Sequence, residues 1–127
     1  MNVAFVVPRY GDGIVGGAET LVRGLAERLA ALGTRVEVLT TCARDRRSWA
    51  NVLQPGAAAE AGVTVRRFPV KGRNTHTFDF LHQRLVRRLP LSITEQLRWA
   101  EESVSRHELY AHLARCRASY DAVCFAP

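Results

Sequence analysis

The chain opens with NVAFVVPRYGDGIVGGAET at residues 2–20, an apolar run followed by a glycine-rich segment. Residues 2–7 are almost continuously apolar, which is typical of a parallel strand covered on both faces. Apolar residues then recur at helical spacing, at Ala18, Leu21, Val22, Leu25, Ala26, Leu29 and Leu32. We therefore expect a helix over residues 18–32 that buries this face, leaves its charged residues in solvent and is capped by Gly33.

The glycine-rich turn, residues 11–17, is suited to holding an anion. The first turn of a helix has backbone N–H groups without intrahelical partners and carries the positive end of the helix dipole. Because glycine has no side chain, a ligand can approach its backbone closely. The sequence therefore predicts an anion site made of the backbone amides of Gly16, Gly17 and Ala18. A tight surface turn without a ligand is the alternative that these residues leave open.

Residues 11–16 also match the GxGxxG fingerprint of dinucleotide-binding folds. In that fingerprint the glycines follow the strand almost directly, and an acidic residue about 20 positions later binds the ribose hydroxyls. Here residues 8–10 intervene, and the second apolar run ends in Thr40-Thr41-Cys42 where the acid would stand. We interpret the match as coincidental and expect neither a nicotinamide nor a flavin cofactor.

Three further apolar runs predict strands, over residues 35–41, 63–68 and 121–125. Residues 43–62 contain a Pro-Gly turn and an alanine run, so we expect a long excursion with at most a short helix near Trp49. Two Ser-x-x-Glu capping boxes, at residues 92–95 and 105–108, predict two helices before the last strand.

The alternation of strands and helices predicts an α/β fold. We expect a Rossmann-like parallel sheet with helices on both faces and the strand order 3-2-1-4. In this order the first strand is central, and the Gly16-Gly17 turn lies where the sheet changes its winding direction. Ligands of open α/β sheets bind at that point.

Several of these segments resemble the start of family 4 glycosyltransferases of the GT-B fold. The matching segments are residues 3–10, 16–20, 25–30 and 36–41, and residues 62–70 and 120–125 resemble that family's third and fourth strands. Gly16-Gly17-Ala18-Glu19 is the most specific element. GT-B enzymes consist of two Rossmann-like domains that face each other across a cleft. The resemblance implies that residues 1–127 form a single, partial N-terminal domain and that the donor-binding C-terminal domain lies outside the chain.

The resemblance further implies a retaining transfer of a sugar from a nucleotide-sugar donor to a sugar or lipid-linked acceptor. The glycine turn would reach the diphosphate of the donor. Candidate substrate contacts are Arg9, Tyr10, Glu19, Thr41 and Arg44. Each also has a purely structural interpretation; Glu19, for example, suits the helix dipole and a pair with Arg23. No residue matches a catalytic position of the family, so the catalytic residues stay unknown and we expect the chain alone to be inactive.

The net charge of +6 raises the question of anionic partners. The arginines are not interleaved with aromatic residues that would stack on bases, so we do not expect nucleic-acid binding. Residues 78–89 are apolar on one side and basic on the other, which suits a surface helix on the inner face of an anionic membrane. A helix docked on the sheet is the alternative that we favour.

Cysteine and histidine usage predicts no metal and no disulfide. Cys42, Cys116 and Cys124 are odd in number and have no Cys-x-x-Cys spacing, and the four histidines complete no metal-binding pattern. No apolar run reaches transmembrane length, and a secretion signal is missing at the N-terminus, so we expect a cytoplasmic protein without cofactors.

Two further expectations concern the end of the chain and the function. Residues 121–125 form a terminal strand with unpaired backbone groups, so we expect this edge to pair with a second copy or to be disordered. A stand-alone Rossmann-like module that binds a nucleotide or a phosphate is the alternative to a transferase. A purely structural α/β domain is the third hypothesis.

Overall fold

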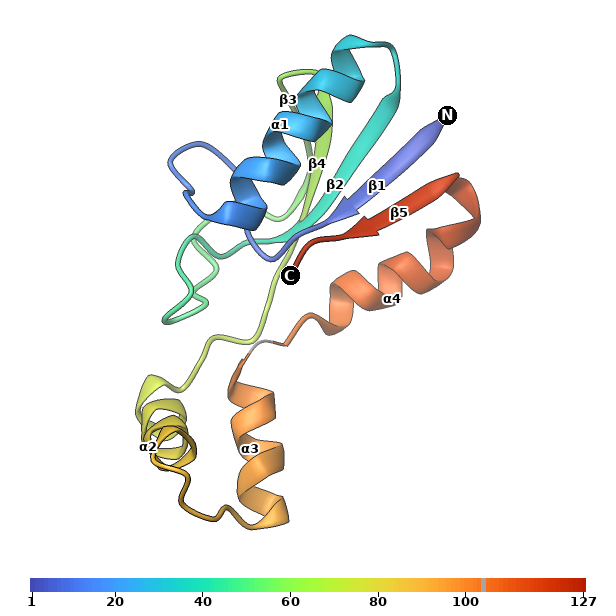
Figure 1. Ribbon diagram of the computed structural model, residues 1–127. Coiled ribbons are helices and arrows are strands. Elements are labelled where there is room, and N and C mark those ends of the chain that lie inside the picture. Colours follow the sequence, from blue (N-terminus) through green and yellow to red (C-terminus); the bar gives the residue numbers. More distant parts are fainter. Residues whose placement is uncertain (104) are drawn as a thin grey trace.

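The computed structural model describes residues 1–103 and 105–127, which form one five-stranded sheet and four α-helices (Figure 1). The elements follow in the order β1 (Asn2–Val6), α1 (Gly17–Ala31), β2 (Arg35–Thr41), β3 (Gly56–Glu60), β4 (Val63–Phe68), α2 (Thr75–Val86), α3 (Ile93–Ser103), α4 (His107–Cys116), a 3-10 helix (Arg117–Ser119) and β5 (Ala122–Phe125).

The strand order is β3-β4-β2-β1-β5, and the four strands β4, β2, β1 and β5 are parallel. These four are the strands expected from the sequence, in the order expected. The expectation that residues 43–62 contain no strand is wrong, because β3 pairs antiparallel with β4 at one edge of the sheet. Ala61 and Gly62 connect the two strands with φ angles of 49° and 78°. Two consecutive left-handed residues are typical of a tight β-hairpin turn.

Helices cover both faces of the sheet, as predicted for this α/β fold. On one face, Val22 and Ala26 of α1 pack in a cluster that includes Val3, Val36 and Val65. On the other face, Leu109 of α4 packs against Val6 and Leu39. Because successive side chains of a strand point to opposite faces, the continuously apolar strands supply both clusters.

The buried face of α1 differs from the predicted one. Leu21, Leu25 and Leu32 are 61%, 44% and 82% exposed, whereas Val22 and Ala26 are buried. The apolar residues extend around more of the helix than the sheet can cover. The smaller side chains face the strands, where they allow a close approach of helix and sheet. The helix also begins and ends one residue earlier than expected, at Gly17 and Ala31.

Helices α2 and α3 form a helical hairpin that projects away from the sheet (Figure 1). The expectation that residues 78–89 dock on the sheet is therefore wrong. Phe78, His82 and Trp99 stack between the two helices, with ring centroids 5.2–6.3 Å apart. Aromatic contacts thus replace the sheet as the packing partner of α2.

Only the first of the two predicted capping boxes forms. The backbone N–H of Glu95 donates to the Ser92 hydroxyl at 3.2 Å, and the backbone N–H of Ser92 donates to the Glu95 carboxylate at 3.0 Å. The second box is wrong, because α4 begins at His107 with Arg106 as its cap. The sequence also groups Leu97, Ala100 and Val104 on one helix face. Val104 lies outside the described residues.

Strand β5 pairs on one side with β1, from Ala122 opposite Val3 to Phe125 opposite Val6. Its other side has no neighbouring strand among the described residues. Self-association through this edge stays a prediction.

Candidate functional site

The candidate site lies at the carboxyl ends of the parallel strands. Three connections meet at this edge: residues 7–16 after β1, residues 42–55 after β2 and residues 69–74 after β4 (Figure 1). Hydrogen bonds and close contacts join Arg9, Glu19 and Arg44, which come from the first two connections and from α1. The topology therefore brings together candidates that are up to 35 residues apart in the sequence.

Two arginines hold the glycine turn in place. Arg67 of β4 donates from Nη2 to the backbone oxygen of Tyr10 at 3.0 Å, and Arg44 donates from Nη2 to that of Asp12 at 2.9 Å. Gly11 and Gly13 have φ angles of 142° and 74°. Side chains rarely adopt such angles, so these two positions need glycine for conformational reasons.

Glu19 is the electrostatic centre of the site. Its side chain is only 2% exposed, and its Oε1 accepts hydrogen bonds from Arg9 Nε at 3.1 Å, Arg9 Nη2 at 2.8 Å and Arg46 Nη2 at 2.9 Å. Burial acts to raise the pKa of Glu19. Hydrogen bonds from its own backbone amide, Arg46 and Arg9 outweigh this effect and lower the pKa below the ordinary value of 4.5.

The expected pair between Glu19 and Arg23 is wrong. Arg23 donates instead to Glu27 at 2.9 Å and to Asp12 at 2.5 Å. Arg46, which the sequence reasoning missed, is the second partner of Glu19. The available signal was the arginine-rich stretch 44–47, directly beyond the end of β2.

The space available for a side chain differs between Gly16 and Gly17. A methyl group at Gly16 would lie 2.1 Å from Oε2 of Glu19, so any side chain there would displace the carboxylate. A methyl group at Gly17 would meet no atom of the described residues within 4 Å. Gly16 thus makes room for Glu19, and Gly17 leaves the start of α1 open to solvent.

The carboxylate of Glu19 therefore shares the helix start with the proposed anion site. Its Oε2 atom is buried and has no hydrogen-bond partner in residues 1–103 and 105–127. The guanidinium groups of Arg9 and Arg46 both donate to Oε1 of this carboxylate, and the guanidinium group of Arg44 donates to the glycine turn at the backbone oxygen of Asp12. Two guanidinium groups thus face one carboxylate at Glu19, which leaves N–H groups of the exposed Arg46 available for an anion.

Thr41 and Tyr10 have structural surroundings. The Thr41 hydroxyl is buried, donates to the backbone oxygen of Pro8 at 2.7 Å and accepts from the backbone N–H of Ala43 at 3.2 Å. Tyr10 is 2% exposed and belongs to the core on the α1 face, and its burial raises the pKa of the phenol above 10.0. For both residues, the contacts favour the structural interpretation over substrate binding.

No metal-binding group was found in the described part of the chain, where no three His, Cys, Asp or Glu side chains gather. Cys42, Cys116 and Cys124 are free thiols, and Cys42 is buried. The amides and guanidinium groups at the start of α1 are suited to binding an anion, and they offer no ligand set for a cation.

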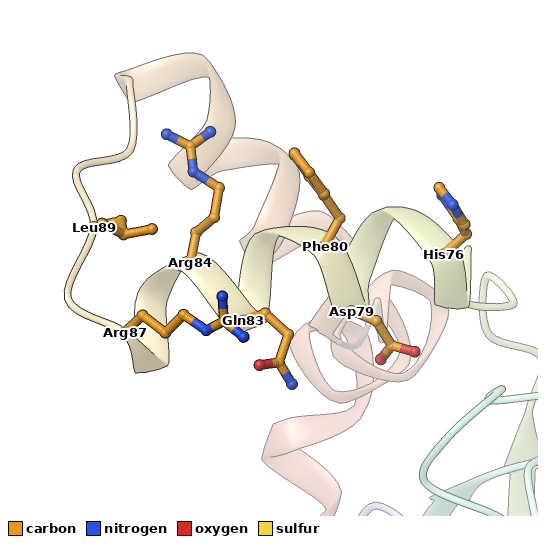
Figure 2. Close-up of a pocket in the computed structure, with 7 residues that line it drawn as sticks. All are labelled: His76, Asp79, Phe80, Gln83, Arg84, Arg87 and Leu89. Carbon is orange, nitrogen blue, oxygen red and sulfur yellow. The ribbon is translucent and has the colours of Figure 1, made fainter.

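A hollow of about 430 Å³ lies away from this site, on the outer face of α2. Figure 2 shows the residues that line it, which are His76, Asp79, Phe80, Gln83, Arg84, Arg87 and Leu89. It shares no residue with the glycine turn.

Comparison with known protein families finds a match. The family model of the glycosyl transferase 4-like domain matches residues 16–100, from the cap of α1 into α3. No curated protein and no solved structure matches the chain significantly.

Proposed function

Since the chain belongs to the glycosyl transferase 4-like domain family, we propose that it is the N-terminal, acceptor-side domain of a GT-B enzyme that transfers a sugar from a nucleotide-sugar donor. The proposal includes a retaining outcome and a cytoplasmic enzyme that acts on a sugar or lipid-linked acceptor. A separate donor-binding domain would complete the cleft. One observation carries the proposal: the open, arginine-flanked start of α1 lies at the carboxyl edge of the sheet.

The donor diphosphate would bind beside Glu19, at the backbone amides of Gly17 and Ala18. These amides lie in the first turn of α1, where the helix leaves N–H groups without intrahelical partners. Arg46 is 57% exposed and donates one hydrogen bond to Glu19. Its remaining N–H groups are available for phosphate oxygen. Negative charge that develops on the departing diphosphate would be stabilised by both groups.

Arg9 has a positioning role in this proposal. Its side chain is 11% exposed, and it joins Glu19 to the backbone oxygen of Arg44 through a 2.9 Å hydrogen bond from Nη1. Each of the three guanidinium nitrogens of Arg9 thus donates a hydrogen bond that holds the two connections together. Arg46 and Arg44 are the more exposed cations and would contact the ligand directly.

A titration of the protein with uridine, guanosine and adenosine diphosphates, followed by amide chemical shifts, tests this site. We expect the largest shifts at Gly16, Gly17 and Ala18. Gly17→Leu should remove the response, because the new side chain would cover the helix start. Gly24→Leu is the matched control, since Gly24 is also in α1 and also has no atom of the described chain within 4 Å of a methyl group.

A second pair of variants tests the arginines. Arg46→Ala should weaken binding by about tenfold, the effect of one hydrogen bond to a charged group. Arg28→Ala, at an exposed arginine in the last turn of α1, should leave binding unchanged. The proposed site would be wrong if the largest amide shifts lie elsewhere in the chain, or if the Gly17→Leu variant binds the nucleotides as the unmodified protein does.

A nucleotide- or phosphate-binding module without transferase activity is the second candidate function. The same amides and arginines favour it, and it predicts the same titration. The two candidates differ in whether sugar reaches an acceptor when the chain is combined with a donor-binding domain. Transfer that Gly17→Leu abolishes would support the enzyme, whereas nucleotide binding without transfer would support the module.

A further inference from the structure

The far end of the α2–α3 hairpin exposes large apolar side chains. We define the hairpin tip as residues 84–93, the end of α2, the turn and the first residue of α3. Four large apolar residues of the tip are exposed, namely Leu85 (43%), Val86 (64%), Leu89 (48%) and Ile93 (77%). Exposed apolar residues that gather in this way usually mark an interaction surface.

The tip is also basic. Residues 84–93 contain three arginines and no acidic residue. Arg84 pairs with Glu95 of α3 at 2.6 Å, whereas Arg87 and Arg88 form no ion pair within the described residues. Figure 2 shows Arg84 and Arg87 at the end of α2, with Leu89 in the turn beside them. Two uncompensated positive charges thus lie next to the exposed aliphatic side chains.

The hairpin tip is placed where it can contact an extended surface. The hairpin projects from the sheet, and its turn lies at the end remote from β4 (Figure 1). The two helices use Phe78, His82 and Trp99 to pack on each other. Phe80 lies on a different face of α2, is 60% exposed and has the Arg84 guanidinium 6.0 Å from its ring centroid. The apolar and basic surface therefore continues from the tip along α2.

From this arrangement we propose that the hairpin tip docks on a bilayer surface that contains anionic lipids. The tip is a projection, and a fluid lipid interface accommodates a projecting apolar surface without needing a complementary pocket. Guanidinium groups pair with lipid phosphates while the neighbouring aliphatic side chains enter the interface. Among the described helices none has the length and apolar composition needed to cross a membrane.

Vesicle flotation measures this binding directly. The protein should bind vesicles of phosphatidylcholine mixed with phosphatidylglycerol. It should bind much more weakly to vesicles of phosphatidylcholine alone. Binding should weaken with added salt, because the electrostatic part is screened. Arg87→Gln with Arg88→Gln should weaken binding to the anionic vesicles by about fivefold for each arginine.

Apolar variants test the other half of the proposal. Leu89→Ser with Ile93→Ser should weaken binding by roughly tenfold or more, because both side chains would enter the interface. Leu21→Ser with Leu32→Ser is the matched control, since these residues are similarly exposed but lie on α1. The control should bind like the unmodified protein.

A tryptophan probe shows which surface faces the lipid. Fluorescence of the Ile93→Trp variant should be quenched by lipids with brominated acyl chains, and fluorescence of Leu32→Trp should not. Equal quenching at both positions would overturn the proposal, as would equal binding to neutral and anionic vesicles. A third outcome would also overturn the proposal: the protein does not bind vesicles but self-associates, and Leu89→Ser with Ile93→Ser abolishes this self-association. The tip would then be a contact with a second copy of the chain. None of these measurements depends on the donor site.

Discussion

Two regions of the molecule are stabilised in different ways. One region is the sheet with α1 and α4, and the other is the α2–α3 hairpin. In the sheet, Ala4, Val38, Leu39, Val63 and Val65 are completely buried. In α2 and α3, the buried residues of the described chain are one leucine, Leu81, and one glutamate, Glu102. Apolar burial therefore stabilises the sheet, whereas the hairpin depends on aromatic stacking and polar links.

Glu102 and Arg73 supply most of the polar links that hold the hairpin. The Glu102 carboxylate accepts from the backbone N–H of Asn74 at 2.7 Å and from Lys71 Nζ at 3.3 Å. Arg73 donates from Nε to the backbone oxygen of Glu102 at 2.7 Å, and its guanidinium lies 3.8 Å from the ring centroid of Phe78. Because polar links and aromatic stacking hold the hairpin, we expect it to loosen while the sheet stays folded.

Truncation of a core residue should have the largest effect. Leu39→Ala leaves a cavity between β2 and α4, and we expect a loss of about 2–5 kcal/mol in the free energy of unfolding. Leu81→Ala is the matched change in the hairpin, at a side chain that is 4% exposed. It should speed amide exchange in residues 75–103 and leave the strands protected. Equal global destabilisation by both variants in denaturant titrations would break the distinction.

Removal of the Glu102 carboxylate should act on the hairpin alone. Glu102→Ala deletes the acceptor for Asn74 and Lys71, and we expect a local loss of roughly 1–3 kcal/mol. Hydrogen exchange should increase in α2 and α3 but not in β1 or β2. Glu101→Ala, at the exposed neighbouring position, is the control and should change neither region.

Acid should loosen the hairpin through the same carboxylate. The hydrogen bond from the Asn74 backbone lowers the pKa of Glu102 below its ordinary value of 4.5, against the effect of burial and with help from Lys71 and Arg98. A lowered pKa in the folded state stabilises the protein fully above about 4.5, and this contribution is lost as the pH falls through the lowered value. Exchange in α2 and α3 should therefore rise in this range, and Glu102→Ala should remove most of that pH dependence.

The smallest effect concerns the two serines of the predicted capping boxes. Ser92→Ala should cost about 1 kcal/mol, because Ser92 caps α3. Ser105→Ala should have almost no effect on stability, because Arg106 and not Ser105 is the cap of α4. Thermal unfolding measures the stability of the two variants. A larger loss of stability for Ser105→Ala than for Ser92→Ala would contradict the observed start of α4.

The parallel strands could be predicted from the sequence because each is a continuous apolar run. Strand β3 could not, because its residues 56–60 read Gly-Ala-Ala-Ala-Glu and contain no β-branched or aromatic side chain. Pairing with β4 defines this strand, and the tight turn at Ala61-Gly62 lacks the usual Asn or Asp. The hairpin was placed wrongly because an amphipathic pattern shows that a helix has an apolar face but does not identify its partner.

At the candidate site, the position of the glycine turn in the fold could be predicted from the sequence, but the ion-pair partner of Glu19 could not. The rule for ligand sites in parallel sheets located the glycine turn with Arg9 and Arg44. The partner of Glu19 was wrong, because helical spacing suggests Arg23 four residues later, whereas Arg46 comes from another connection 27 residues away. Side-chain direction in the folded chain, which spacing alone does not contain, decided both this pair and the burial of Tyr10.

A single oxygen, Oε1 of Glu19, ties together the segments after β1 and β2 and the start of α1. This arrangement constrains how the sequence can drift during evolution. A neutral residue at position 19 would leave Arg9 as a nearly buried cation without a counter-ion, and a side chain at position 16 would force the glutamate out. We therefore expect related chains to keep or to lose Gly16, Glu19 and Arg9 as a set.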